Sequence, residues 1–442
     1  MKNNLNEITI IGAGLAGCEA AYQIAKNNIK VNLYDMKPNK YSPAHKSDNL
    51  AELVCSNSFK SISEDKASGI LKLEMLELDS LIIKSALRSK IPAGGALAVD
   101  REKFSEYVTK NIKNNPLIEI FEEEVLLIPK DLQSPLIIAT GPLTSEKFTK
   151  SIEEFIGNEN LSFYDSISPI VSAESLDNEN YFKASRYEDG EGDYINCPLN
   201  EKEYNSFYEA LINSEKIEFH QFEKPKYFEG CLPIEVMAER GFDTLRFGPM
   251  KPVGLLNPKT GKRPFAVIQL RKENSHESMW NIVGFQTKMK IKDQKNVFSI
   301  VPALRNAEFL RFGSIHRNTY INSPNTILNT LQSKKNPYIF FAGQITGVEG
   351  YSESTAMGLI AGLNSIRVLK KQEPIVFPST SAIGCLTKYI SNSDNKKIDP
   401  MNINLGLFEI NKPKKNIEKI KKSSKECIIQ IKERNQIELD LV

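Results

Sequence analysis

The first 35 residues carry the clearest pattern of apolar and polar positions in the chain. Residues 8–11, ITII, form an apolar run of the kind that a parallel strand buried on both faces requires. A helical stripe follows, Asn27 and Asn28 end it, and residues 31–35, VNLYD, predict the next strand. The stripe consists of Ala20, Ala21, Ile24 and Ala25. The pattern predicts a strand, a turn, a helix and a second strand of a parallel α/β sheet.

Similar patterns recur further along the chain. Apolar residues at helical spacing predict one amphipathic helix over Gly69–Ser89, and another helix begins around Asp100. Strands are predicted at Ile118–Glu124, Leu126–Ile128 and Pro135–Gly141. Near the C-terminus, an apolar strand at Tyr338–Phe341 precedes a small-residue helix at Ser354–Leu369. This pair repeats the order of the opening unit, so both ends of the chain are expected to contribute to one domain.

The turn after the first strand has G-x-G-x-x-G spacing. Gly12 permits a tight turn, Gly14 lets a pyrophosphate approach the backbone, and Gly17 lets the helix pack close to the strand. Asp35, at the end of the second strand, suits a hydrogen bond to a ribose 2'-hydroxyl and would repel the extra phosphate of NADP. The predicted ligand is therefore FAD or NAD. The alternative is a glycine-rich turn in another kind of sheet.

The sequence pattern changes between Ser162 and Asn325, where aromatic residues, prolines and short predicted strands become frequent. We interpret this stretch as a mixed α+β domain inserted into the first. The predicted fold class is α/β, with a discontinuous Rossmann-type domain for FAD or NAD from residues 1–161 and 326–442 and an inserted domain from residues 162–325. The tail from Lys412 on is basic, and its pattern is typical of a solvated helix face.

Composition narrows the functional classes. The 442 residues, 40% hydrophobic and 25% charged, are typical of a globular protein of two domains. The net charge of +2 gives no global field for nucleic acid, so an RNA-binding surface would be a local patch. A polar N-terminus and the lack of an apolar run of about 18 residues predict a cytoplasmic protein. The spacing of the six cysteines and four histidines predicts free thiols and no metal site.

Two cysteines lie in stretches that suit a reactive thiol. Cys55 lies beside residues 56–58, SNS, and close in sequence to the nucleotide site, which favours a polar and partly open environment. Cys231 precedes a helix-like run from Pro233, whose free N–H groups would stabilise a thiolate. A buried, inert cysteine is the commoner state of any single thiol and is the alternative.

Basic residues and aromatic rings are interleaved after Cys231. Positive charge and stacking faces are what an RNA strand needs, and a solvated basic face is the alternative. The basic residues of this stretch are Arg240, Arg246, Lys251, Lys262, Arg263 and Arg271, and the rings are Phe242, Phe247 and Phe265. The candidate RNA-binding residues are Arg246, Lys251, Arg271, His316 and Arg317.

Taken together, these stretches make the chain similar to the folate- and FAD-dependent tRNA uracil-5-methyltransferase family. The resemblance covers nearly the whole chain and rests on separate blocks in one order, which is far more specific than the glycine motif alone. The blocks are GAGLAGCEAA, PAHKSDNLAELVCSNS, IPAGGALAVDR, DGEGDYINCP, FEGCLPIEVMAERGFDTLRFGPMKPVGL, FAVIQLR, HRNTYINSP and FAGQITGVEGY. Cys385, in AIGC, departs from the small residue usual in the family, and neither it nor Asp35 touches the expected chemistry.

The resemblance implies an enzyme that methylates carbon 5 of a uridine in the tRNA T-loop, with FAD as cofactor and methylenetetrahydrofolate and NADPH or NADH as co-substrates. It implies Cys231 as the nucleophile on the base and Cys55 as the partner thiol or base, with the reverse assignment as the alternative. It further implies no DNA, membrane or obligatory protein partner. The expected cofactor residues are Gly12, Gly14, Leu15, Ala16, Gly17, Asp35, Gly141, Gly343, Gln344, Glu349 and Gly350.

Three alternatives stay open at this stage. Relatives of this family include paralogues that act on a uridine of large-subunit ribosomal RNA by the same chemistry. A flavoprotein resembling the partner-dependent enzyme of tRNA wobble-uridine carboxymethylaminomethyl modification shares the opening fold, although the FEGC block argues against it. A non-enzymatic RNA-binding protein would bind no flavin.

Overall fold

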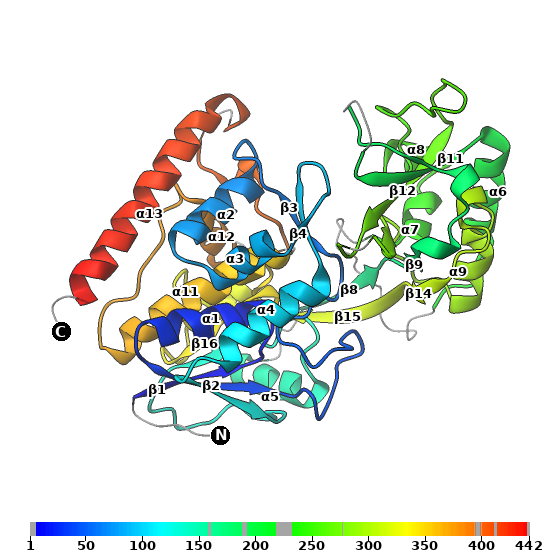
Figure 1. The fold of residues 1–442 in the computed structure, drawn as a ribbon. Helices are drawn as coiled ribbons and strands as arrows, with labels where there is room; N and C mark the ends of the chain where they lie inside the picture. The colour runs from blue at the N-terminus through cyan, green and yellow to red at the C-terminus, as the bar shows by residue number, and fades with distance from the viewer. Residues whose placement is uncertain are drawn as a thin grey trace.

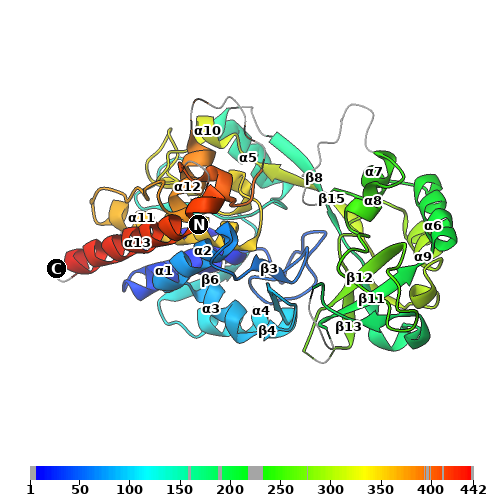
Figure 2. The ribbon, with the colours of Figure 1, turned by 90° about the horizontal axis from the view of Figure 1, so that it is seen from above.

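The computed structural model describes residues 6–157, 161–187, 192–217, 232–275, 277–392, 394, 398, 400–410 and 413–439. These residues form a larger part, built from both ends of the chain, and a smaller part built from its middle (Figure 1). The view from above shows the smaller part, in green, against one side of the larger part (Figure 2). The α/β fold class expected from the sequence is confirmed.

A five-stranded parallel sheet lies at the centre of the larger part, in the order β16-β7-β1-β2-β6. In its register, Ile11 is opposite Tyr34 and Ile138, so neighbouring strands end at one edge. Because β16 comes from the C-terminal part of the chain, the sheet is discontinuous in sequence. The strands are β1 (Glu7–Ile11), β2 (Lys30–Asp35), β6 (Ile118–Glu122), β7 (Leu136–Ile138) and β16 (Ile339–Phe341).

Helices pack against this sheet, and α1 (Leu15–Lys26), which follows the first turn, packs very closely against α11 (Tyr351–Leu369) from the C-terminal part of the chain (Figure 1). A Cβ atom at Gly358 of α11 would lie 2.2 Å from the Ala16 carbonyl oxygen of α1, so only glycine permits this contact. The other helices are α2 (Ala67–Glu77), α3 (Leu81–Arg88), α4 (Arg101–Lys113), α5 (Glu146–Ile156), α10 (Ser323–Thr326), α12 (Ala382–Ser391) and α13 (Ile417–Leu439). A small sheet contains β3 (Ser58–Ser61), β4 (Lys90–Ile91) and β5 (Ala96–Val99).

The smaller part contains a six-stranded antiparallel sheet in the order β10-β11-β12-β13-β9-β14. One face packs a core that includes Trp280, and a ribbon of β8 (Leu161–Ile167) and β15 (Ser314–Tyr320) joins the two parts (Figure 1). The strands are β9 (Ile170–Ser172), β10 (Phe182–Lys183), β11 (Tyr194–Leu199), β12 (Ala266–Lys272), β13 (Met279–Ile282) and β14 (Phe309–Arg311). The helices are α6 (Glu201–Asn213), α7 (Ile234–Glu239), α8 (Thr244–Phe247) and α9 (Ile291–Phe298).

Two predicted elements are wrong. The single helix expected over Gly69–Ser89 is two helices, because Asp79 has a φ of 65° and the Ser80 side chain caps α3 by accepting from the Ile83 N–H. The strand expected at Leu126–Ile128 is an irregular segment with a mostly exposed Leu127. Within the described ranges, no helix combines the length and apolar character that a membrane span requires.

Candidate active site

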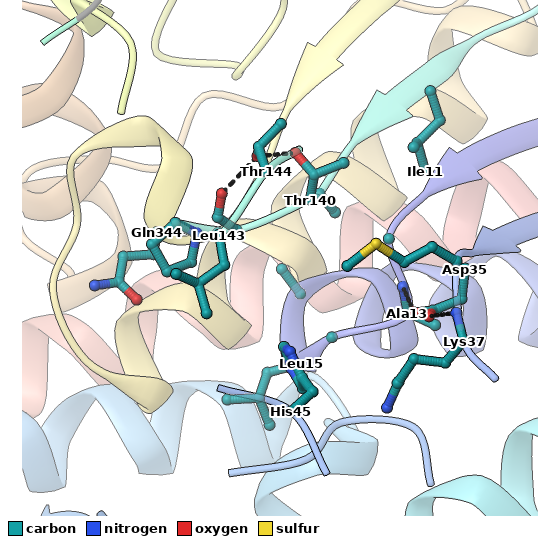
Figure 3. Close-up of a pocket in the computed structure, with 18 of the residues that line it drawn as sticks. Ile11, Ala13, Leu15, Asp35, Lys37, His45, Thr140, Leu143, Thr144 and Gln344 are labelled. Carbon is teal, nitrogen blue, oxygen red and sulfur yellow. Dashed lines mark hydrogen bonds between the residues drawn. The ribbon is translucent and has the colours of Figure 1, made fainter. Parts of the chain in front are cut away.

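A cavity of about 1140 Å³, open to solvent, lies where β1, β2, β7 and β16 end (Figure 3). This edge, at the carboxyl ends of parallel strands, is where doubly wound folds bind ligands. Of the predicted cofactor residues, eight line the cavity: Gly12, Gly14, Leu15, Ala16, Asp35, Gly141, Gly343 and Gln344. The other three, Gly17, Glu349 and Gly350, are not among the residues that line it.

The three glycines of the first turn occupy different environments. Gly12 has a φ of 100°, and a Cβ atom on it would lie 2.5 Å from the Ala139 carbonyl oxygen. A Cβ on Gly17 would lie 1.8 Å from the Gly12 carbonyl oxygen, so Gly17 permits the close packing of α1. Gly14 has no atom within 4 Å of such a Cβ, and its open side faces the cavity. The turn therefore fits a ligand that approaches the backbone at Gly14.

Asp35 is fixed at the end of β2 by two backbone groups. Its Oδ2 accepts from the Ala13 N–H and its Oδ1 from the Lys37 N–H, both at 2.9 Å (Figure 3). Each carboxylate oxygen has a second lone pair, so the side chain still has acceptor capacity for hydroxyl groups in the cavity. The first turn and this carboxylate together fit the pyrophosphate and ribose of a dinucleotide.

The opposite wall comes from the C-terminal part of the chain. Gly343 has a φ of 82° and lies against the first turn of α1, where its Cβ would lie 2.9 Å from the Ala16 Cβ. Gln344 faces the cavity and donates through Nε2 to Glu349 Oε2 at 2.8 Å. Glu349 therefore orients a residue that lines the cavity.

Cys55 lies beside this cavity, which Val54 and Tyr351 line. The Tyr351 hydroxyl oxygen accepts from the N–H groups of Cys55, at 2.9 Å, and Ser56, at 3.1 Å. Burial and the negative charge of a Cys55 thiolate raise the pKa of Tyr351, so its hydroxyl group stays neutral. Cys55 is half-buried, which agrees with the partly open environment that its sequence context predicts.

The other described thiols are buried: Cys18, Cys197, Cys385 and Cys427. Desolvation raises the pKa of Cys385 to about 12, as expected for an inert thiol. Cys231 lies outside the described residues, so its environment stays a prediction. The helix expected after it is α7, which begins at Ile234 behind Pro233.

The predicted RNA-binding residues lie in different places. The Arg246 guanidinium lies 3.7 Å from the centre of the Phe265 ring, and Lys251 is exposed. Arg271 does not share that surface, because it is buried between the two parts and donates through Nε to Asn57 Oδ1 at 2.9 Å. The remaining two, His316 and Arg317, belong to β15.

A row of residues crosses the inserted sheet opposite the Cys55 loop. In the register, Tyr194 is opposite Arg271, Arg271 is opposite Asn281, and Ile170 is opposite both Asn281 and Arg311. Cross-strand partners share a face, and Tyr194 and Arg271 both bond to the larger part. This face of the sheet is therefore turned toward the larger part, where Arg271 bonds to Asn57 beside Cys55.

Sequence reasoning did not identify three residues that surround Cys55. Arg101 bonds to Glu273 and to the Cys55 carbonyl group, and Tyr351 holds two N–H groups of the same loop. These residues are far apart in the chain, so their proximity appears only in the fold. Among the described residues, no group of three His, Cys, Asp or Glu side chains has an arrangement that would hold a metal ion.

The fold and this cavity define a dinucleotide-binding α/β protein with an inserted domain. A family model described as glucose inhibited division protein A matches residues 7–373. Two crystal forms of Aquifex aeolicus GidA superpose with TM-scores of 0.69 and 0.70 at 16% and 17% identity, covering 96% and 97% of this chain and 74% and 78% of theirs. At this identity, the likeness concerns the fold.

Sequence relatives identify a narrower family. The methylenetetrahydrofolate--tRNA-(uracil-5-)-methyltransferase TrmFO of Enterococcus faecalis is 54% identical over 91% of this chain and 92% of its own. The protein of the same name from Pelotomaculum thermopropionicum is 54% identical over 91% of both chains. The chain belongs to this methyltransferase family, as its motifs predict.

Proposed function

We propose that this protein methylates carbon 5 of a uridine in the tRNA T-loop, using methylenetetrahydrofolate as one-carbon donor, FAD as cofactor and NADPH or NADH as reductant. The observation that carries the proposal is the half-buried Cys55 beside a dinucleotide cavity, in a chain 54% identical to enzymes named for this reaction. We further propose that it is a cytoplasmic enzyme that needs no membrane, DNA or obligatory protein partner.

The cavity suits FAD because of its backbone and its carboxylate. Gly14 and the first turn of α1, where no side chain caps the helix, would hold the pyrophosphate, and Asp35 would accept a hydrogen bond from a ribose hydroxyl group. Gly343 and Gln344, on the opposite wall, would contact the ring system. When bound, FAD supplies the redox chemistry that converts the folate one-carbon unit into a methyl group. Residues 1–161 and 326–442 hold FAD, and residues 162–325 face folate and RNA.

The two thiols have different roles: one activates the uracil ring and the other removes a proton from it. Uracil carbon 5 is a poor nucleophile, and addition of the Cys231 thiolate to carbon 6 gives an enolate in which carbon 5 is nucleophilic. Cys55, as a thiolate, then accepts the proton that carbon 5 loses after it has gained the one-carbon unit, and the bond between Cys231 and carbon 6 breaks, which restores the Cys231 thiolate. These two roles are our assignment, and the reverse assignment is the alternative.

RNA binds across the inserted domain. Arg246 and Lys251 contact phosphates, and the exposed ring of Phe247, at 83% exposure, offers a stacking face beside them. His316 and Arg317, in β15, are the further RNA-binding candidates. Because the target base is stacked in folded RNA, the enzyme flips it out before the thiol adds.

The test offers two unmodified transcripts to the FAD-loaded protein, with labelled methylenetetrahydrofolate and reduced nicotinamide. One transcript carries a tRNA T-arm and the other a large-subunit ribosomal RNA fragment. Label in the T-loop uridine is expected. Label only in the ribosomal fragment would refute the tRNA target but keep the chemistry, and label in neither with FAD bound would favour a partner-dependent flavoprotein.

Cysteine variants test the assignment of the thiols. Cys231→Ala and Cys55→Ala are expected to abolish turnover with FAD still bound, and only Cys55→Ala is expected to accumulate RNA covalently attached to the enzyme. Cys427→Ala removes a buried thiol of α13 and serves as the matched control. Covalent RNA in Cys231→Ala instead of Cys55→Ala would show that the two roles are reversed.

A further inference from the structure

We propose that Arg101 is a positioning residue for the Cys55 thiol, and that Glu273 of the inserted domain orients Arg101. The two residues therefore connect the inserted domain to the reactive loop, which we define as residues 53–57. This inference rests on the proposed function, because it assigns Arg101 and Glu273 to the step in which Cys55 acts.

The guanidinium of Arg101 bonds to both the loop and the inserted domain. Its Nη1 donates to the Leu53 carbonyl oxygen, and its Nη2 donates to the Cys55 carbonyl oxygen at 3.3 Å. On its other side, Nε donates to Glu273 Oε2 and Nη2 to Glu273 Oε1 at 3.3 Å. One planar group thus fixes two carbonyl groups of the loop and one carboxylate of the other domain.

Burial makes this arrangement specific. The side chain of Arg101 is 16% exposed and that of Glu273 is 1% exposed, so neither charge has full access to water. A guanidinium presents five donors in a rigid plane, whereas an ammonium group is a point charge on a flexible chain. Lysine at this position would keep the charge and lose the fork that reaches the loop and the carboxylate together.

The inserted domain reaches the reactive loop by a second route. Arg271 Nε donates to Asn57 Oδ1 at 2.9 Å, and Asn57 Nδ2 donates to the Lys272 carbonyl oxygen at 2.8 Å. Three consecutive residues of the inserted domain, 271–273, therefore hold both ends of the loop that carries Cys55. A shift of the inserted domain would therefore move the loop and the Cys55 thiol with it.

Position matters for the step assigned to Cys55. A general base removes a proton only within about 3 Å of the donor atom, and displacement of about 1 Å reduces such rates by up to about 100-fold. The hydrogen bonds of Arg101 reach the main chain of the loop and Glu273, so the role that we assign to it is to position the loop. Its loss is therefore expected to lower kcat and leave substrate binding unchanged.

The experiment compares full-length FAD-loaded variants. Arg101→Gln alone leaves Glu273 buried without its partner, which is strongly destabilising, so the decisive protein is the double variant Arg101→Gln/Glu273→Gln, in which both charges are removed. Glu273→Gln alone likewise leaves the Arg101 charge without its partner, so it is interpreted beside the double variant; it tests orientation, because the Glu273 carboxylate bonds to Arg101. Arg101→Lys tests whether charge without the fork suffices.

Lys103→Ala is the matched control. Lys103 crosses the same interface, with Nζ donating to Ser275 Oγ at 2.5 Å, and is not bonded to the reactive loop. Two readouts are needed: kcat and KM for methylation of the T-arm transcript, and deuterium exchange at the Cys55 and Ser56 amides. The second readout does not require the enzyme to methylate anything.

The double variant, Glu273→Gln and Arg101→Lys are each expected to lower kcat by about 10-fold with KM within about twofold of the original, and to speed exchange at both amides. Lys103→Ala is expected to match the unmodified protein. A folded double variant with normal kcat or normal exchange, or one that changes KM alone, would overturn the inference. If the unmodified protein methylates no uridine, the proposed function fails, and the exchange data still decide whether Arg101 and Glu273 hold the loop.

Discussion

Substituting Gly14 separates the fold of the first turn from its proposed role in FAD binding. Gly14 has φ −74° and ψ −167°, an extended conformation that any residue adopts, and an added Cβ has no neighbour within 4 Å. Gly14→Ala is therefore expected to change the free energy of unfolding by less than about 1 kcal/mol. The lower conformational entropy of the unfolded variant contributes a small stabilisation. The added methyl group would extend into the cavity instead.

The expected loss of FAD affinity follows from the hydrogen bonds that a pyrophosphate forms with backbone N–H groups. A methyl group at Gly14 keeps the anion from the backbone and removes about two such bonds. Each hydrogen bond to a charged group contributes about 1.5–3 kcal/mol, so the total is about 3–6 kcal/mol. This corresponds to at least about 100-fold weaker binding.

The assay titrates FAD into flavin-free protein, follows flavin fluorescence, and measures thermal unfolding of the same samples. Gly17→Ala is the matched variant, because its Cβ would lie 1.8 Å from the Gly12 carbonyl oxygen. It is expected to destabilise the fold itself by about 3 kcal/mol or more. FAD affinity of Gly14→Ala within about threefold of the original would refute the placement of the pyrophosphate at this turn.

Two further predictions concern buried polar groups. Burial raises the pKa of Glu74 from 4.5 to about 7, because the folded protein favours the neutral carboxyl group. The stabilisation that this neutral group provides is complete below pH 4.5 and is lost as pH rises through 7. Between pH 4.5 and pH 8, the free energy of unfolding of the original protein should therefore fall by about 3 kcal/mol relative to that of Glu74→Gln, as measured by thermal unfolding. Parallel curves of this free energy against pH would contradict the prediction. Tyr351→Phe removes the acceptor of the Cys55 and Ser56 N–H groups, and is expected to speed their deuterium exchange and cost about 1–3 kcal/mol of stability, whereas unchanged exchange would show that another acceptor replaces it.

Local signals account for what the sequence predicted well. The apolar run, the glycine spacing and the terminal acid lie within 28 residues, and the structure has β1, α1 and β2 in that order with Asp35 at the end. Asp100, expected near the start of a helix, is the N-cap of α4 and accepts from the Lys103 N–H. Each of these features depends on residues a few positions apart, which a sequence pattern contains.

The surroundings of Cys55 depend on contacts that no local pattern contains. Tyr351 is 295 and 296 positions from the two amides that it holds, and Arg101 is 172 positions from Glu273. The break between α2 and α3 escaped prediction for a different reason. Apolar spacing continues across Asp79 and Ser80, while the positive φ of Asp79 and the cap at Ser80 end one helix and begin another.

The position of Arg271 in the fold could not be predicted from its basic neighbours in the sequence. Proximity in sequence groups Arg271 with Arg246 and Lys251, but side chains alternate across a strand, so register decides which face each one occupies. In β12, Ile268 and Leu270 pack into the inserted core, whereas Arg271 points to the opposite face and bonds to Asn57. A substitution at Arg271 should therefore disturb the Cys55 loop, and a loss of RNA affinity without faster exchange in that loop would contradict this placement.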